Sequence, residues 1–401
     1  MDIWLSKNIL KKFQSIIRKK EFMDRKEFIN AERIVIKLGT NTLRNDNGEV
    51  SLPRIYSYIE DIAHLIKTGK EVILVTSGAV GLGRKKINIE KSDDVVIKQA
   101  CAAIGQCKLM SLYEDGFGSY NVTTAQVLLT EDDFSQRKRY LNLRNTLNKL
   151  LELKVLPIIN QNDTVSTVEL DEIYQDMQVC FSDNDKLSAL VASEMDADLL
   201  VILSDVDGLF DSNPKDNPNA NIITEVKEVT DEILKLGKEA SENGRGGFRS
   251  KLEAAKQVNR FGGKVLIANG KQPFVIKEIF EGKEIGTAFL PNENGLSEKK
   301  RWIGYATNVI GKITVNNGAK KAILNNSSLL PIGIINVVNE FKKGEVVSIV
   351  DEQGQEIARG MVNYNSDDCR KISGYHSNDI LKILGYKNYD AVVTRDNITI
   401  L

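Results

Sequence analysis

Short apolar runs rich in β-branched residues alternate, from Arg33 onward, with longer stretches in which apolar residues recur at helical spacing. The short runs predict buried strands at residues 33–37, 71–76, 123–129, 155–160 and 199–203, and the longer stretches predict helices near residues 54–67, 95–115, 139–153 and 186–197. Strands that alternate with helices of this length form mostly parallel sheets with helices on both faces. We therefore predict an α/β fold with a doubly wound, mostly parallel sheet sandwiched by helices.

The character of the sequence changes towards its C-terminal end. Another strand is expected at residues 265–268, in a second sheet region, and short strands with turn signals follow at residues 312–315, 344–349 and 391–394. A chain of 401 residues is too long for one ordinary domain. We expect an N-terminal extension at residues 1–30, a main domain at residues 31–298 and a small β-rich domain at residues 308–401.

The composition argues against several classes of protein. The 54 basic and 55 acidic side chains nearly cancel, so no overall charge draws the chain to nucleic acid or to a membrane surface. The four cysteines are scattered without a C-x-x-C pair, which argues against a zinc site or a disulfide framework and favours a reducing cytoplasm. Since the chain has only two histidines, a mechanism built on a histidine base is not expected.

The first 30 residues contain a basic amphipathic pattern. Lysines and arginines are interleaved with apolar residues at helical spacing, namely Ile9, Leu10, Phe13, Ile16 and Ile17. One interpretation is a helix that lies on a membrane or a partner. The other is an upstream extension, because Met23 closely precedes the first strand. No apolar run is long enough to predict a membrane span, and the segment lacks the features of a secretory signal.

Three polar segments, far apart in the sequence, carry the chemistry. They are residues 37–41, residues 184–189, which begin with Asn184-Asp185, and the Gly-rich residues 244–251. Together they offer two lysines, an acid and exposed backbone N–H groups, which can hold and transfer a phosphoryl group. The usual signatures, G-x-x-x-x-G-K-S/T and a G-x-G-x-x-G between strand and helix, are absent from the sequence. We therefore predict a kinase of a different design.

The two lysines of these segments each break a local rule. Lys37 ends an otherwise apolar strand, where an ammonium group is unfavourable unless it is used. Lys251 falls in the first turn of a predicted helix, where a cation opposes the helix dipole unless an anion neutralises it. The alternative for Lys37 is an ordinary strand-to-helix turn with a lysine at its edge. We favour phosphate binding for both lysines.

Further polar residues follow the ends of the predicted strands. They are Ser77, Asn160, Asp163, Asn184, Asp185, Ser204 and Asp205. Each has a structural alternative, because Asn and Asp cap helices or form Asx turns, and the glycines after Ser77 also suit close helix packing. Ligands of parallel sheets bind at the carboxyl ends of the strands. The convergence of these residues at one such edge favours a binding site.

The motifs, taken in order, resemble a known family. Residues 35–40, 75–79, 162–163, 183–185 and 301–303 resemble the glutamate 5-kinases (gamma-glutamyl kinases) of the amino acid kinase superfamily, and residues 327–331, 343–346 and 364–366 are similar to a PUA domain. The resemblance spans roughly residues 33–401. It implies an amino acid kinase fold with a C-terminal PUA-like domain, and phosphorylation of the side-chain carboxylate of L-glutamate by ATP with Mg²⁺, the first step of proline biosynthesis.

The resemblance also implies a role for each matching residue. Lys37 and Lys251 would hold the phosphoryl group in flight, and Asp185 would orient the two lysines. Glutamate would be bound by Ser77, Asp163, Asn184 and Asn160. ATP would be contacted by Lys37, Gly39, Thr40, Ser204, Asp205, Arg245, Gly246, Gly247, Phe248, Arg249, Ser250 and Lys251. No cluster of metal-ligating side chains is expected, because Mg²⁺ would be carried mainly by ATP oxygens.

The same resemblance implies feedback inhibition by proline, a homo-oligomer, and hand-off of the product to a glutamyl phosphate reductase. Three departures from the family pattern bear on these properties. Arg245 and Phe248 replace a threonine and a methionine of the loop, Asn41 replaces a common serine, and the segment 164–183 is longer than usual, with residues 172–177 as extra material. This segment lies beside the expected glutamate site, so we expect it to bear on substrate affinity and on control by proline.

Three alternatives remain open at this point. One is another superfamily member that acts on carbamate, aspartate, acetylglutamate or a nucleoside monophosphate. A second is RNA binding or modification through the PUA-like domain, although its 11 basic and 10 acidic side chains form no basic stripe in the sequence. The third is a regulator that binds a metabolite without catalysis.

Overall fold

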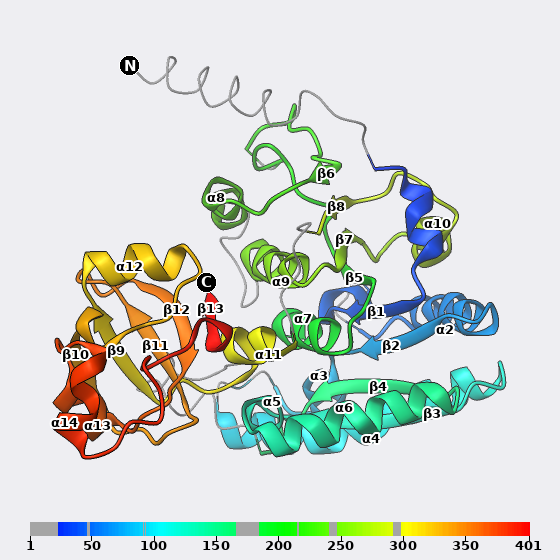
Figure 1. Cartoon of the computed structure of the whole chain (residues 1–401). Coiled ribbons are helices and arrows are strands. Elements are labelled where there is room, and N and C mark those ends of the chain that lie inside the picture. The colour runs from blue at the N-terminus through cyan, green and yellow to red at the C-terminus, as the bar shows by residue number, and fades with distance from the viewer. Residues whose placement is uncertain are drawn as a thin grey trace.

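The computed structural model describes residues 23–45, 49–90, 92, 94–165, 184–214, 216–239, 247–291 and 298–401. Within these residues the chain forms two units, each built on its own sheet (Figure 1). The larger sheet has the strand order β3-β4-β2-β1-β5-β7-β8-β6, and the smaller has the order β10-β9-β11-β12-β13. The predicted fold class, an α/β unit with a small C-terminal β-rich unit, is confirmed.

The larger sheet is mostly parallel, as the alternating pattern predicts. Its strands are β1 (Arg33–Leu38), β2 (Glu71–Val75), β3 (Thr124–Leu129), β4 (Leu156–Gln161), β5 (Leu199–Ser204), β6 (Glu225–Val226), β7 (Lys264–Asn269) and β8 (Thr287–Phe289). Among the pairs formed by the described residues, only β7 with β8 is antiparallel. The prediction that residues 265–268 start a second sheet region is wrong, because β7 pairs along its whole length with β5.

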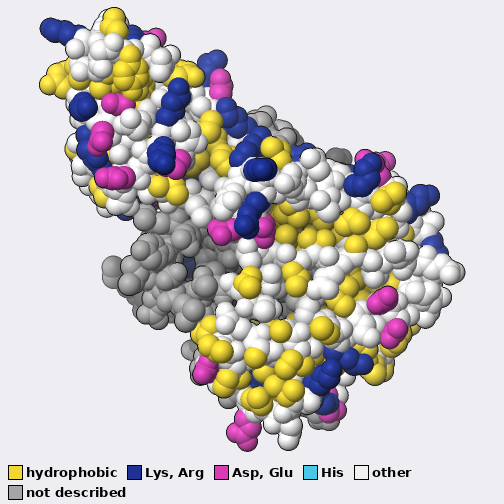
Figure 2. All heavy atoms as spheres, turned by 90° about the horizontal axis from the view of Figure 1, so that it is seen from below, with side chains coloured by type: hydrophobic (Ala, Val, Ile, Leu, Met, Phe, Trp, Pro, Cys, Tyr) yellow, Lys and Arg dark blue, Asp and Glu magenta, His cyan; other side chains and the backbone are white. Residues whose placement is uncertain are grey.

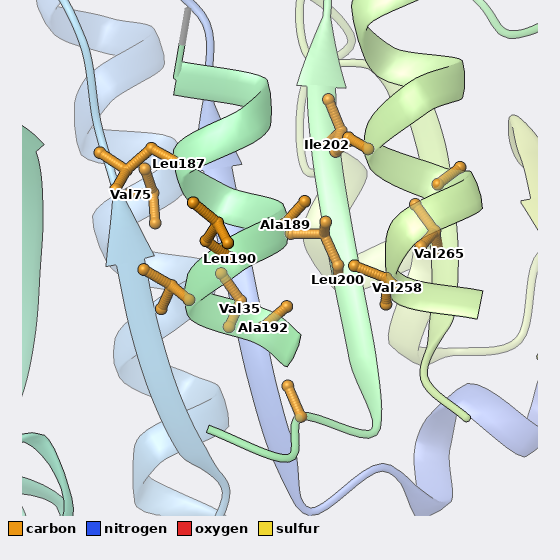
Figure 3. Close-up of a cluster of buried hydrophobic side chains, with 14 of the residues drawn as sticks. Val35, Val75, Leu187, Ala189, Leu190, Ala192, Leu200, Ile202, Val258 and Val265 are labelled. Carbon is orange, nitrogen blue, oxygen red and sulfur yellow. The ribbon is translucent and has the colours of Figure 1, made fainter. Parts of the chain in front are cut away.

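Helices cover both faces of this sheet (Figure 1). One face packs against α2 (Leu52–Lys67), α4 (Val95–Gly118) and α10 (Val275–Phe280), and the other against α5 (Glu131–Ser135), α6 (Arg137–Glu152), α7 (Asn184–Glu194), α8 (Asp231–Glu239) and α9 (Phe248–Arg260). Figure 3 shows α7 and α9 placing Leu187, Leu190 and Val258 over β1, β2 and β5. None of the helices in the described part of the chain is both long and apolar enough to cross a membrane.

The strand order creates a switch point beside β1. From β1 the chain continues to β2 and β4 on one side, and it then returns to β5 on the opposite side of β1. The connections therefore leave the carboxyl ends of β1 and β5 in opposite directions and open a crevice between them. Doubly wound sheets bind their ligands at such a crevice. The fold thus places Lys37 of β1 and Ser204 of β5 at the expected ligand edge.

The smaller unit contains β9 (Gly311–Val315), α12 (Asn317–Leu324), β10 (Ile334–Val338), β11 (Val346–Val350), β12 (Glu356–Met361), α13 (Ser366–Ile372), α14 (Ile380–Leu384) and β13 (Ile398–Ile400). The predicted strand at 391–394 is wrong. Val392 and Val393 are buried in the core, but the run pairs only through an isolated bridge between Leu329 and Val393. The run is apolar because it packs in the core, and a buried run of this kind need not belong to a sheet.

A short helical segment joins the two units. It comprises α11 (Glu298–Arg301) and the π-helical turn Trp302–Ala306, which lie between the units in Figure 1. The indole of Trp302 donates to the carbonyl of Phe134 at 3.2 Å, and the Thr399 hydroxyl donates to the carbonyl of Lys300 at 2.7 Å. The segment is therefore hydrogen-bonded to both the α/β unit and β13.

The helix that leads away from the ligand edge, α3 (Ala79–Ile87), crosses α4 at very close range. The crossing point is formed by Gly83 and Gly105. A Cβ atom on Gly105 would collide with the carbonyl oxygen of Ala79, and one on Gly83 would collide with that of Cys101. Only glycine therefore permits this backbone contact, which sets the depth of α3 in the fold.

We predict that Gly105→Ala lowers the free energy of unfolding by at least about 2 kcal/mol, because the methyl group must push two backbones apart. Gly118→Ala, in the same helix, is the matched control, since a Cβ atom there meets nothing within 4 Å. That control should leave stability unchanged or raise it by up to about 1 kcal/mol. Urea unfolding of both variants measures the difference, and equal stabilities would contradict the crossing described here.

Candidate active site

A polar cavity of about 380 Å³ opens at the carboxyl ends of β1, β2, β4 and β5. This volume lies in the range of small-molecule sites. The predicted site residues that line it are Lys37, Gly39, Thr40, Ser77, Asn160, Asp163, Asn184, Asp185, Ser204, Asp205 and Lys251. The fold therefore brings together side chains from six separate stretches of sequence.

The centre of the cavity wall is an ionic cluster around Asp185. Asp185 lies in the first turn of α7, and its Oδ1 atom accepts a hydrogen bond from Nζ of Lys37 at 2.5 Å. Its Oδ2 atom accepts from Nζ of Lys251 at 3.1 Å and from the hydroxyl of Ser250 at 2.7 Å. One carboxylate thus holds a lysine from β1 and a lysine from α9 on its two oxygens.

Burial makes this cluster electrostatically strong. Asp185 is 1% exposed, Lys37 6% and Lys251 8%. Burial alone would raise the pKa of the Asp185 carboxyl, but the two ammonium groups and the Ser250 hydroxyl outweigh it and lower the pKa to about 2. Two ammonium groups and one carboxylate sum to a charge of +1, so these three groups together favour an anion in the cavity.

Asn184 connects the ends of β2 and β4 beside the ionic cluster. Its amide nitrogen donates to the carbonyl of Thr76 at 2.8 Å, to the hydroxyl of Ser77 at 2.7 Å and to Oδ1 of Asn160 at 3.2 Å. The carbonyl of Thr76 can only accept, so the orientation of the Asn184 amide is fixed. Its Oδ1 atom is buried and has no hydrogen-bond partner in the described structure. A buried acceptor of this kind suits a ligand that donates a hydrogen bond to it.

A second group of polar side chains lies at the end of β5. The Asn41 amide donates to Oδ2 of Asp205 at 2.9 Å, and the Ser204 hydroxyl donates to Oδ1 of Asp205 at 3.3 Å. Burial raises the pKa of the Asp205 carboxyl, but these hydrogen bonds outweigh the effect and lower it. The asparagine at position 41 therefore ties the turn after β1 to the turn after β5.

The Gly-rich turn after β1 differs from the expected anion cradle. The backbone N–H of Gly39 donates to the carbonyl of Leu203 at 3.3 Å, and its backbone is extended, a conformation open to any residue. A Cβ atom here would lie 3.5 Å from Nζ of Lys37. This distance is an ordinary contact, so the lysine does not require a glycine here, and a single turn of 3-10 helix, Thr40–Leu43, begins directly after Gly39.

The predicted nucleotide loop is only partly described. Arg245 and Gly246 lie outside the described residues, as do residues 172–177 and the basic pattern of residues 1–22. Gly247 precedes α9, and Phe248 is 7% exposed in the hydrophobic core, so its side chain faces away from the cavity solvent. Arg249 pairs with Glu253 at 2.7 Å, and Ser250 bonds to Asp185. None of these four residues lines the cavity.

The structure adds residues that the sequence did not single out. Gln106, in α4, accepts from the Asn160 amide at 2.9 Å and fixes that side chain from behind. Arg44 and Arg84 line the cavity on the side away from Ser204. No sequence signal marked either arginine, since each lies in an ordinary polar context. Within the described residues, no three His, Cys, Asp or Glu side chains gather as a metal centre.

The sequence is similar to known proteins over most of its length. The sequence matches the amino acid kinase family over residues 32–269 and the PUA domain over residues 311–384. It is 46% identical over 372 residues to the protein named glutamate 5-kinase of Caldanaerobacter subterraneus subsp. tengcongensis, a match that covers 92% of this chain and 98% of the relative. The protein of the same name from Moorella thermoacetica is 45% identical over 374 residues, and this match covers 92% of this chain and 97% of the relative.

Among solved structures, this chain resembles carbamate kinase from Giardia lamblia bound to AMP-PNP, and the match covers 66% of this chain and 100% of that one. The TM-score is 0.46 and the sequence identity is 15%.

The ionic cluster predicts a pH dependence of stability. The folded pKa of Asp185, about 2, lies below its ordinary value of 3.8, so its contribution is complete above pH 3.8 and is lost as the pH falls towards 2. We expect the wild-type chain to lose about 2 kcal/mol of unfolding free energy through this group between pH 5 and pH 2. Urea unfolding across this range should show that Asp185→Asn lacks this loss.

Asp115→Asn, which removes an exposed carboxylate of α4, is the control and should keep the wild-type slope. If wild type and Asp185→Asn lose stability in parallel as the pH falls, Asp185 does not carry the ionic interaction described.

Proposed function

Because the chain belongs to the amino acid kinase family, and within it to the glutamate 5-kinases, we propose that it transfers the γ-phosphoryl group of ATP to the side-chain carboxylate of L-glutamate. The products are L-glutamyl 5-phosphate and ADP, and the reaction is the first step of proline biosynthesis. The observation that carries the proposal is the Asp185 cluster, which holds two lysines on one wall of the cavity.

The chemistry needs charge stabilisation more than proton transfer. A free glutamate side chain titrates near ~4.3, so at neutral pH its carboxylate oxygen attacks the γ-phosphorus without losing a proton. The new O–P bond forms as the bond from the γ-phosphorus to the β–γ bridging oxygen breaks, and ADP leaves with that electron pair. The barrier is repulsion between an anion and a polyanion, which fixed cations reduce.

In this scheme Lys37 and Lys251 bind the phosphoryl group from β1 and α9. Asp185 keeps both ammonium groups aimed at the same part of the cavity, and Ser250 holds the carboxylate of Asp185 in place. The excess of one positive charge among the three ionic groups is what the transferred phosphoryl group would neutralise. Such preorganised charge needs no rearrangement during the reaction.

Glutamate would lie on the β2 and β4 side of the cavity. Ser77, Asn160, Asp163 and Asn184 line this side. The unpartnered Oδ1 atom of Asn184 supports this placement, because it is a buried acceptor suited to the α-ammonium group of an amino acid. The negative charge of the Asp163 carboxylate would also attract this α-ammonium group.

ATP would enter from the β5 side, past Ser204 and Asp205, with its phosphates near Gly39, Thr40 and the two lysines. The 245–251 segment precedes and begins α9, so we place it beside the nucleotide. Ser204 and Asp205 offer a hydroxyl and a carboxylate, oxygen donors of the kind that Mg²⁺ accepts. When bound, Mg²⁺ would be held mainly by ATP oxygens and would offset phosphate charge.

The activity is tested by trapping the acyl phosphate with hydroxylamine. The chain should form the hydroxamate of glutamate only with ATP and Mg²⁺ present, and aspartate and acetylglutamate should give none. With carbamate and UMP, whose phosphorylated products form no carboxylic hydroxamate, release of ADP is measured instead and should stay at background. Activity on another acceptor but not on glutamate would overturn the assignment. Repeating the assay with added proline tests the expected feedback inhibition in the same experiment.

RNA as the main partner finds no support on the visible face of the molecule. Figure 2 shows lysines and arginines mixed with aspartates and glutamates over the C-terminal unit, at the upper left, without a basic stripe. Electrostatic RNA binding needs such a stripe.

We predict that Lys37→Ala and Lys251→Ala each lower kcat by about 10²–10³-fold, in line with the loss of one preorganised donor. Either variant keeps one lysine on Asp185, so folding should survive. Lys256→Ala, which removes a cation from the same helix as Lys251 outside the cavity lining, is the control and should turn over normally. Near-normal kcat in a folded Lys37 or Lys251 variant would remove that lysine from the mechanism.

A further inference from the structure

Two arginines stand side by side at the far end of the active-site cavity. Arg44 follows the 3-10 turn after β1, and Arg84 lies in α3. A second cavity of about 290 Å³ adjoins the first, and both cavities are lined by Arg44, Arg84, Ser77 and Gly81. The guanidinium pair therefore stands at the boundary between the two cavities.

The pair is electrostatically unfavourable in the structure as it stands. Among the described residues, neither guanidinium donates a hydrogen bond or meets a carboxylate, and the Nε atom of Arg84 is buried without a partner. Burial, followed by the proximity of Arg84, lowers the pKa of Arg44. Two half-buried cations that repel one another, one of them with an unpartnered Nε atom, favour the binding of an anion between them.

Both arginines are held on rigid supports. The carbonyl of Arg44 accepts from the guanidinium of Arg54 at 2.6 Å, and its backbone bridges to Val50. Arg84 is carried by α3, whose depth is set by the glycine crossing with α4. The guanidinium of Arg44 lies close over Gly81, where the missing side chain leaves it room. The fold thus fixes the backbone of Arg44 and the helix that carries Arg84.

We propose that Arg44 and Arg84 bind the α-carboxylate of the acceptor and so select a dicarboxylic amino acid. The inference rests on the proposed function and extends it to specificity. Arginine forks bind carboxylates with two parallel hydrogen bonds. The acceptor is then held at three points: its reacting carboxylate near Lys37, its ammonium group at Asn184 and Asp163, and its α-carboxylate at the arginine pair.

This arrangement explains how one site handles two carboxylates of the same molecule. The lysine cluster presents point charges suited to the moving phosphoryl group, whereas the arginine pair presents planar donors suited to a carboxylate that does not react. The Asn184 nitrogen donates to the ends of β2 and β4, which leaves the oxygen of the same amide to accept the ammonium group. An acceptor without the α-carboxylate would leave both guanidiniums unpaired and should be phosphorylated only weakly.

The test compares wild type, Arg84→Gln, Arg44→Gln and Arg84→Lys in the hydroxamate assay with two acceptors. Glutamate carries the α-carboxylate, whereas 4-aminobutyrate keeps the amine and the reacting carboxylate but lacks it. We expect Arg84→Gln to raise KM for glutamate about 10- to 100-fold, the range for a hydrogen bond to a charged group. Its KM for ATP and its turnover of 4-aminobutyrate should stay within about twofold of wild type, because substitutions affect distant, independent sites by no more than this.

Lys86→Gln is the matched control, because it removes an exposed cation from the same helix and should change none of these values. Arg84→Lys keeps the charge but loses the fork, so it should fall between wild type and Arg84→Gln. Thermal unfolding should show Arg84→Gln to be as stable as wild type or more stable, because a repulsive contact with Arg44 is removed.

The outcomes separate this inference from the proposed function. A wild-type chain that does not phosphorylate glutamate would overturn both. Normal wild-type activity with an unchanged glutamate KM in Arg84→Gln and Arg44→Gln would overturn only the arginine assignment. A raised KM for ATP, with glutamate unaffected, would likewise overturn it, since the pair would then serve phosphate.

Discussion

The ion pairs of Asp185 with Lys37 and Lys251 are the interaction on which the rest of the site depends. They join β1, α7 and α9, elements separated by 148 and 66 residues in the sequence. Buried ion pairs contribute little net stability, but removing one partner leaves an uncompensated charge. The main role of the cluster is therefore to hold two cations in the wall of the cavity. It can do so only because one carboxylate has two oxygens to share between them.

The sheet topology explains why these groups meet. The chain leaves β1 to one side and returns to β5 on the other, so the crevice at their carboxyl ends is open to ligands. Around that crevice the polar groups are sorted by type: the lysines lie at the centre, Asn184 and Asp163 lie on the β4 side, and the arginine pair comes from α3 and the turn after β1. The glycine crossing of α3 with α4 connects fold to specificity, because it sets where Arg84 lies.

Much of this arrangement follows from the sequence, and the exceptions have physical reasons. The strands and helices of the α/β unit were predictable because their periodicity is strong, and Lys37 and Lys251 were noticeable because each breaks a local rule. Arg84 breaks none: a basic residue near the end of a helix is favourable anyway, and only the tertiary structure turns it inwards. The sheet position of β7 is set by a crossover that local pattern cannot show. Likewise, the apolar side chains of residues 391–394 enter the core, and the sequence pattern cannot distinguish such a buried loop from a strand.

The most direct test of the account is a crystal structure with glutamate, Mg²⁺, ADP and a metal fluoride that mimics the transferring phosphoryl group. The account predicts that Nζ of Lys37 and Nζ of Lys251 both lie within hydrogen-bonding distance of the fluoride group, with Asp185 still bonded to each. A complex in which either ammonium group points away from the fluoride group, or in which Asp185 has released both lysines, would contradict it.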